Sequence, residues 1–253
     1  MAEQLTMVSL EEQPLGNSFE KVFIGNAGSA GGAGLDITDV FSTYLYVGTG
    51  DEAQKTIVNG VDLAGEGGLV WTKSRTNTQS NTLGDSESGL QYYLHTNTTV
   101  GHTDPLTAYY NAFNNNGYTI GNSEATTNEL NSLNQNFVSW TFRKAPKFFD
   151  IVGPFTGDGI AGRTVAHNLG SVPGMIIVKR TNTTGSWVVY HRGLNNGSSP
   201  EDYGIILNTA AGQTDQSLYW NDTAPTDTNF TLGSAGSVNG SGSTYIAYVF
   251  AHN

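Results

Sequence analysis

An internal repeat constrains the fold of this chain more than any other feature. GLVWTKSRTNT (68–78) is echoed by GMIIVKRTNT (174–183), and FVSWTFR (137–143) is echoed by YIAYVFA (245–251). Four further pairs keep the same order along the two copies. They are TGD (49–51) with TGD (156–158), TIVNG (56–60) with TVAHN (164–168), YYLHT (92–96) with IILNT (205–209), and YTIG (118–121) with FTLG (230–233). Six ordered pairs indicate a duplication, and a period of roughly a hundred residues suits a small domain and is too long for a solenoid unit.

Both copies show the pattern of antiparallel strands. Each consists of short runs rich in Val, Ile, Tyr, Trp and Thr, separated by clusters of Gly, Asn, Ser and Asp. Alternation places Val138, Trp140 and Phe142 on one face of a strand, with the small polar residues Ser139 and Thr141 on the other. The sequence therefore predicts an all-β fold: two tandem homologous antiparallel β-sandwich domains, jelly-roll-like, after an extended N-terminal segment.

The repeat also sets the expected domain boundaries. We expect a first β domain over 41–145 and a second, its repeat, over 146–253. The link RKAPKFFDIVGP (143–154) is short and partly apolar, so the two domains should pack together. Residues 1–40 have no counterpart in the repeat, and FIGNAGSAGGAGLD (23–36) lacks the G-x-G-x-x-G spacing of a nucleotide-binding turn. We expect this segment to attach the protein to another one through a glycine-rich connector.

Composition argues against several classes of function. The formal net charge of −11 disfavours nucleic-acid binding, which needs clustered Lys and Arg. The chain has no cysteine, so it has no disulfide framework and no thiolate metal site. Its start carries acids where a signal peptide carries lysines, and no run approaches the roughly 18 apolar residues of a membrane span. We expect synthesis in a cytoplasm and no membrane insertion.

Catalytic motifs are missing from the sequence, including G-x-S-x-G, H-E-x-x-H and the P-loop. Asp85 and Glu87 could form a glycosidase carboxylate pair, but carboxylates on a Gly/Ser-rich loop are more often simply solvated. Asp51 and Asp158, each in T-G-D, could bind calcium, although an Asp that caps its own turn is the simpler account. His167 is expected to be a polar strand-end residue. We therefore expect no enzyme, with no catalytic residue, no cofactor-binding residue, no metal and no cofactor.

Two cation pairs recur after the central strand of each copy. They are Lys73 with Arg75 and Lys179 with Arg180. A strand-end salt bridge, or hydrogen bonds from the cations to loop carbonyls, explains the recurrence without a ligand.

Aromatic residues in matching polar stretches form the candidate binding surface. TAYYNAF (107–113) and SLYWNDT (217–223) lack a clean alternation, so some of their rings could face outward. Such rings suit a glycan, because a ring stacks on the C–H face of a sugar while neighbouring amides bond to its hydroxyls. The same rings could instead cap the core or fill a subunit interface. The candidate residues are Tyr109, Tyr110, Tyr219 and Trp220.

The ordered motifs of both copies are similar to those of one known family. The first copy reads GLVWTKSRTNT, LGDSESGLQYYLHTNTT, FNNNGYTIGN and NFVSWTFRK, and the second carries H-x-L-G-x-x-P-x-x-I-I-V-K-R, W-x-V-Y-H and V-N-x-S-G-x-x-Y-I-A-Y-x-F. Over roughly residues 45–251 the chain resembles a duplicated domain of tail-fibre and related virion proteins of aquatic, especially marine, tailed bacteriophages. It departs from their pattern in two loops, with Asn-Asn-Gly in place of D-G and Ala-Gly-Glu-Gly-Gly in place of an F-x-P-D turn.

The resemblance implies a virion structural protein, a tail fibre or host-facing appendage with an adhesin role. It also implies a homo-oligomer such as a trimer. We expect attachment to other virion proteins through residues 1–40, because this segment has no counterpart in the repeat, and the aromatic residues add a host cell-surface glycan as a candidate partner. Two alternatives stay open. One is a decoration or minor tail or baseplate protein with a purely structural role, and the less favoured one is a polysaccharide-binding or polysaccharide-degrading appendage.

Overall fold

The computed structural model describes residues 35–50, 54–90, 92–103, 109–121 and 129–252. The chain divides into two compact units, 1–35 and 36–253, and the predicted attachment segment 1–40 lies almost wholly outside the described residues. Strands dominate the described part, which confirms the prediction of an all-β fold. Its helices are short: α1 (Ile37–Val40), α2 (Ser217–Trp220) and the 3-10 segments η1 (Leu194–Gly197) and η2 (Pro200–Asp202). None of the helices among these residues is long and apolar enough to cross a membrane.

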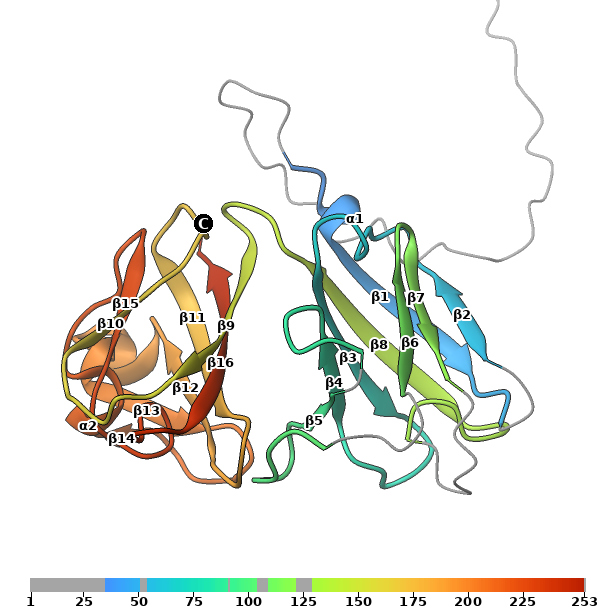
Figure 1. Ribbon diagram of the computed structural model, residues 1–253. Coiled ribbons are helices and arrows are strands. Elements are labelled where there is room, and N and C mark those ends of the chain that lie inside the picture. Colours follow the sequence, from blue (N-terminus) through green and yellow to red (C-terminus); the bar gives the residue numbers. More distant parts are fainter. Residues whose placement is uncertain (1–34, 51–53, 91, 104–108, 122–128, 253) are drawn as a thin grey trace, which may run out of the picture. The chain divides into compact units, whose positions relative to one another are not determined.

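We call residues 36–145 the first half and residues 146–252 the second half. The first half contains a five-stranded antiparallel sheet, the first main sheet, in the order β1 (Phe41–Val47), β8 (Asn136–Arg143), β3 (Gly68–Ser74), β4 (Thr82–Asp85), β5 (Leu94–His95). A three-stranded sheet packs on one of its faces (Figure 1), in the order β2 (Lys55–Val58), β7 (Gly117–Ile120), β6 (Tyr110–Asn114).

The second half is built in the same way. Its six-stranded antiparallel sheet, the second main sheet, has the order β9 (Phe149–Thr156), β16 (Thr244–Ala251), β11 (Pro173–Arg180), β12 (Trp187–His191), β13 (Tyr203–Ile206), β14 (Thr214–Asp215). A two-stranded sheet packs on one of its faces, formed by β10 (Arg163–Ala166) and β15 (Asn229–Leu232).

The five strands of the first main sheet have counterparts in the second main sheet, whose sixth strand, β14, has none. The order β1-β8-β3-β4-β5 in the first half matches β9-β16-β11-β12-β13 in the second. The repeated sequence segments fall on these matching strands, for example 68–78 on β3 and 174–183 on β11. Each of the four sheets takes its strands from one side of residue 145. The domain limits 41–145 and 146–253 themselves stay a prediction.

Each half has its own apolar core between its main sheet and its smaller sheet. In the first half, Phe137 and Val70 of the main sheet pack against Tyr118, Ile57 and Ile120 of the smaller one. Burial of this apolar surface is the main source of stability, at roughly 25 cal/mol per Å². The second half repeats the arrangement with the side chains of Val178, Val188, Ala247, Phe230 and Leu232.

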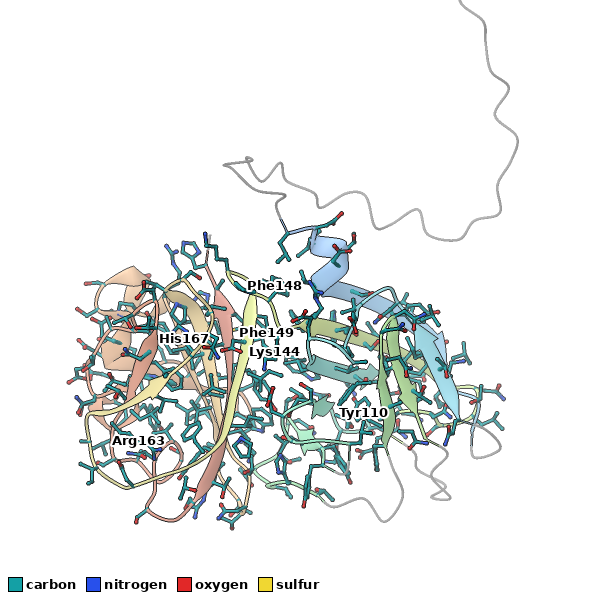
Figure 2. The ribbon with its side chains drawn as sticks, turned by 45° about the horizontal axis from the view of Figure 1, so that its top comes forward. Tyr110, Lys144, Phe148, Phe149, Arg163 and His167 are labelled. Carbon is teal, nitrogen blue, oxygen red and sulfur yellow. The ribbon has the colours of Figure 1, made fainter. Side chains whose placement is uncertain are left out.

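A third core, the inter-sheet core, joins the outer faces of the two main sheets. Leu69, Leu83 and Leu94 of the first half and Ile177, Trp187, Val189, Ile246 and Tyr248 of the second all belong to it. The link also contributes, because Phe149, at the start of β9, is buried in this core and lies 5.7 Å from the ring of Phe142. Figure 2 labels Phe148 and Phe149 where the chain enters β9.

Strand β8 shows which way the alternating side chains of a predicted strand point in the structure. Val138, Trp140 and Phe142 share a face, as predicted, but they point away from the core of the first half. The opposite face is the more buried one, since Ser139 and Thr141 are both fully buried. Their hydroxyls have partners: Tyr118 donates to Ser139 at 2.7 Å, and Asn59 Nδ2 donates to Thr141 at 2.9 Å. Satisfied hydroxyls are tolerated inside a core, so small polar residues do not mark the outer face here.

Candidate binding site

Two indoles stand together on the outer face of the first main sheet. Trp71 of β3 is the direct cross-strand partner of Trp140 of β8. Their rings lie 6.1 Å apart at 68°, an edge-to-face arrangement that aromatic pairs favour. Trp71 borders the inter-sheet core, whereas Trp140 lies outside it, and both rings are only partly buried. This face of the sheet therefore presents aromatic surface that the second half does not cover.

The two indoles form the walls of a pocket of about 460 Å³, lined by Trp71, Lys73, Asn81, Trp140 and Phe142. A second pocket of about 360 Å³ shares Trp71 and Asn81 with the first, and the loop Leu207–Ala210 of the second half forms its far side. Concave, mainly apolar sites with a few polar groups are where proteins commonly bind small ligands. We call these two adjoining spaces the aromatic pocket.

Two polar side chains of the aromatic pocket retain hydrogen-bonding capacity. Lys73 Nζ donates to Gln79 O at 2.8 Å and approaches Asn77 O at 3.5 Å. Among the described residues it has no carboxylate partner, so an ammonium with three protons keeps a donor for a ligand. The backbone N–H of Asn81 is used, since it donates to Asn97 Oδ1 at 2.9 Å. The side-chain amide of Asn81 makes no hydrogen bond to the residues that the structure describes.

Comparison with known proteins places the region that carries this pocket in a family. The family model described as "Domain of unknown function (DUF7483)" matches residues 36–253, which is most of the chain. The chain belongs to the DUF7483 family. The match begins at the residue where the second compact unit begins, so the DUF7483 domain and that unit coincide. Comparisons with curated proteins and with solved structures gave no match.

Two of the four aromatic residues predicted for a binding surface belong instead to the cores of the DUF7483 domain. Tyr110 is 1% exposed and Trp220 is 2% exposed. Tyr110 lies between the sheets of the first half (Figure 2), where its hydroxyl donates to Val70 O at 3.2 Å. It packs flat over Gly84, where a Cβ atom would lie 2.4 Å from the ring. The ring of Trp220 packs edge-on against Tyr190 at 6.0 Å. An outward position is therefore wrong for these two, and the core alternative is correct.

The other two predicted rings are partly buried. Tyr109 stacks on Tyr93 with ring centroids 4.1 Å apart, and the ring of Tyr219 lies over Gly204. Neither residue lines the aromatic pocket. A ligand contact at either one stays a prediction.

The carboxylates considered for catalysis are held by structural contacts. Asp85 is buried and accepts hydrogen bonds from Tyr248 Oη at 2.8 Å and from Ser88 N at 2.7 Å. Burial raises the pKa of this carboxyl. Glu87 forms an ion pair of 2.6 Å with Lys144, which Figure 2 labels after β8. The expectation that these two acids are simply solvated is therefore wrong for Asp85, whose bond to Tyr248 joins the two halves.

Removal of the Tyr248 hydroxyl tests this contact. Tyr248→Phe leaves a buried carboxylate without one donor, so we expect the free energy of unfolding to fall by about 2 kcal/mol. Urea denaturation at neutral pH measures the change. Tyr203→Phe is the matched control, since this partly buried ring makes no hydroxyl contact among the described residues, and it should change the value by less than about 0.5 kcal/mol. Equal effects of the two variants would contradict a role for the Asp85 contact.

The remaining sequence candidates have structural roles in the described part of the chain. Asp158 accepts from Ile160 N at 2.8 Å and from Asn239 Nδ2 at 2.9 Å, so it caps its own turn as the simpler account predicted. Asp51 lies outside the described residues, and within them no group of three or more potential ligands could hold a metal. His167 (Figure 2) is buried at the end of β10 beside Phe230, and burial lowers its pKa.

The recurring lysines bind loop carbonyls, one of the two explanations offered by the sequence. Lys73 Nζ reaches the carbonyl of Gln79, and Lys179 Nζ reaches that of Gly185 at 2.6 Å, six residues further along in both cases. Lys179 also donates to Thr99 O of the first half at 2.9 Å. It is fully buried, and burial lowers its pKa to about 8.

The residues of the aromatic pocket were not among the predicted binding residues. The sequence contains a signal for them, but only in a comparison of the two copies. Trp71, Asn81 and Trp140 stand where the second copy has Ile177, Trp187 and Tyr248. Positions that differ in this way between otherwise similar copies are where the copies can differ in function.

Proposed function

We propose that this protein is a bacteriophage virion structural protein, a tail fibre or host-facing appendage, whose DUF7483 domain binds a host cell-surface glycan in the aromatic pocket. The observation that carries the proposal is the open pair of indoles, Trp71 and Trp140, beside the ammonium of Lys73, which has no carboxylate partner among the described residues. The virion location rests on the sequence resemblance, and the attachment through residues 1–40 rests on the absence of a counterpart to this segment in the repeat.

The architecture proposed for this function is two tandem homologous β-sandwich domains of jelly-roll type, at 41–145 and 146–253. The matching strand order of the two main sheets supports a common origin of the halves. A rigid, turn-rich β scaffold of this kind suits a fibre, because binding residues on such scaffolds keep their positions.

A glycan fits the chemistry of the pocket better than a strongly charged ligand. Pyranose rings have flat C–H faces that pack on indoles, and their hydroxyls accept or donate hydrogen bonds at the ring edge. Lys73 and Asn81 supply donors at that edge. Around the two indoles the walls are otherwise apolar, and the adjoining space adds only uncharged polar side chains such as Asn97 and Thr209, which orients a ring without fixing a charge.

Binding without cleavage follows from the state of the carboxylates. Glycoside hydrolysis commonly uses two carboxylates flanking the sugar, about 5 to 9.5 Å apart. The pocket lining contains no Asp or Glu among the described residues. A polysaccharide-degrading appendage would need its acids elsewhere, and a decoration or minor tail protein would need no open pocket.

The decisive experiment measures binding of the full chain to an array of bacterial surface oligosaccharides. Trp140→Ala should weaken binding at least tenfold, because it removes one stacking surface worth roughly 1.5 kcal/mol. The control is Tyr92→Ala, which removes a ring that is 39% exposed and lies outside the pocket. Thermal unfolding shows that each variant is folded. Absence of binding by the unaltered chain would contradict the adhesin role and favour the purely structural alternative.

Self-assembly is tested separately, by the molar mass of the purified chain from light scattering, with and without residues 1–35. A stable oligomer such as a trimer in both forms would support a fibre assembled through the DUF7483 domain. A monomer in both forms would contradict a self-assembling fibre and favour a decoration protein.

A further inference from the structure

The two halves share one backbone position that carries very different side chains, Asn81 in the first and Trp187 in the second. The N–H of Asn81 donates to Asn97 Oδ1, and the N–H of Trp187 donates to Asn208 Oδ1, both at 2.9 Å. The carbonyls of both residues accept a backbone bond of 3.0 Å from the residue that precedes the respective asparagine. Equal hydrogen bonding makes the positions equivalent, and it matches Asn97 with Asn208, two residues from the match suggested by sequence alone.

The surroundings of this position also correspond. Trp71 pairs with Trp140 across β3 and β8, and Ile177 pairs with Tyr248 across β11 and β16. In each half a lysine lies two residues further along the central strand, Lys73 after Trp71 and Lys179 after Ile177. Lys179 is the direct strand partner of Trp187. The matched positions are Trp71 with Ile177, Lys73 with Lys179, Trp140 with Tyr248, and Phe142 with Phe250.

In the second half the equivalent of the aromatic pocket is filled by the chain itself. Trp187 is fully buried, with Lys179 Nζ 5.6 Å from its ring centre and the ring of Tyr248 stacked at 6.3 Å. Its indole N–H donates to two carbonyls of the first half, His95 O and Thr98 O, both at 3.1 Å. A planar ring thus occupies this place, with a cation over its face and acceptors at its edge.

The first half offers the same place with no ring of its own. The loop of the second half that faces it repeats the geometry of 95–98: Thr209 N donates to Ile206 O at 3.2 Å, as Thr98 N donates to His95 O. The carbonyls equivalent to those of His95 and Thr98 are those of Ile206 and Thr209. Residues 207–210 of this loop line the aromatic pocket. The acceptors for a ring edge are therefore equivalent in the two places, and only the ring is lacking in the first.

The side-chain exchanges between the halves indicate what kind of ring enters. The second half surrounds its indole with Ile177 and Tyr248, whereas the first half has an indole at each of these positions, Trp71 and Trp140. In the second half the space is filled by Trp187. The equivalent residue of the first half is Asn81, whose side chain is an amide. Indole walls and an amide donor suit a ring with C–H faces and edge hydroxyls.

We infer that one pyranose ring of the glycan occupies the place that the Trp187 indole fills in the second half, an assignment that rests on the proposed glycan-binding function. Its face packs on Trp71 and Trp140, and its edge hydroxyls donate to the carbonyls at 206 and 209. Lys73 and Asn81 donate to its oxygens. The described residues therefore form one glycan site of this kind, lined by both halves, because Trp187 occupies the equivalent place in the second half.

Asn81→Trp tests this assignment by giving the first half the residue that the second half already has. The new indole should fill the pocket, weaken binding of the array oligosaccharide at least tenfold, and leave the melting temperature unchanged or raised. Asn81→Ala is the matched control: it removes the amide but leaves the pocket open, so binding should weaken only a few-fold. A loss in Asn81→Ala equal to that in Asn81→Trp would overturn the assignment.

A second measurement needs no variant. Indole, as a free probe, should compete with methyl β-D-glucopyranoside or methyl β-D-galactopyranoside for the unaltered chain in an NMR titration. Sugar binding that indole does not displace, or that Asn81→Trp leaves intact, would overturn the assignment while the proposed function stands. If indole binds and no sugar or oligosaccharide does, the proposed function fails, and the pocket is instead a receptor for an aromatic side chain of a partner protein.

Discussion

Replacing Trp187 by alanine should lower the free energy of unfolding by about 4 kcal/mol. The indole is fully buried in the inter-sheet core, and truncation of a buried aromatic leaves a cavity that costs about 3–5 kcal/mol. The variant also leaves the carbonyls of His95 and Thr98 without their indole donor and Lys179 without its ring. Urea denaturation followed by far-UV circular dichroism measures the loss.

Two further variants separate the causes of that loss. Trp187→Phe keeps an aromatic ring in the core and removes the indole N–H with part of the ring volume, so we expect a smaller decrease, of about 1–2 kcal/mol. Trp220→Ala removes an indole of equal size from the core within the second half, without touching the contact between halves. Only Trp187→Ala should separate the unfolding of the two halves into distinct steps. A loss below about 1 kcal/mol in Trp187→Ala would contradict the packing described here.

The contribution of Lys179 to stability should increase as the pH is raised from 7 to about 10.5. Burial lowers the pKa of this ammonium from 10.5 to about 8, because the charged form loses water and gains no carboxylate partner among the described residues. Between these two values the folded state has released the proton and the unfolded chain has not, so stability rises with pH. At about 1.4 kcal/mol per pKa unit, the gain from this group is about 3 kcal/mol.

Lys179→Met provides the control for the pH experiment. Methionine has a similar length and no charge, so the rise between pH 8 and 10.5 should disappear from the unfolding free energies of this variant. Its stability at pH 7 depends on two opposing effects, the removal of a buried charge and the loss of the lysine donor to the carbonyls of Gly185 and Thr99. The Thr99 carbonyl keeps a second donor, the backbone N–H of Gly185 at 2.8 Å. An equal rise in both proteins would contradict the assignment of the pH effect to Lys179.

The strands and their faces were predictable, but the neighbours of each face were not. Alternation in FVSWTF correctly placed Trp140 and Phe142 together. It gave no information on whether that face met the smaller sheet of its own half or the other half. The buried position of Ser139 depends on a hydroxyl contributed by Tyr118 from another sheet, and a contact of that range leaves no trace in the local pattern.

The candidate binding site shows the same limit. Tyr110 and Trp220 stand in polar stretches whose pattern left both an outward and a core position open. In the structure, Gly84 beneath one ring and Tyr190 beside the other provide room in the cores. Trp71 and Trp140 follow a regular strand pattern, which predicts burial, and they are partly open because the second main sheet covers only part of their face. The alternation of residues in the sequence shows on which face of a strand a side chain lies. Its exposed fraction depends instead on how far the neighbouring sheet extends over that face.

The inter-sheet core has a consequence for the two halves of this chain. Both halves enter it with equivalent residues, Leu83 of the first and Val189 of the second, Phe142 of the first and Phe250 of the second. Contact of a surface with its own equivalent is the rule of an isologous dimer. The described halves thus contact each other as the two subunits of an isologous dimer do. Because both halves lie in one chain, equivalent positions can carry different side chains, as Asn81 and Trp187 do, which two identical chains could not.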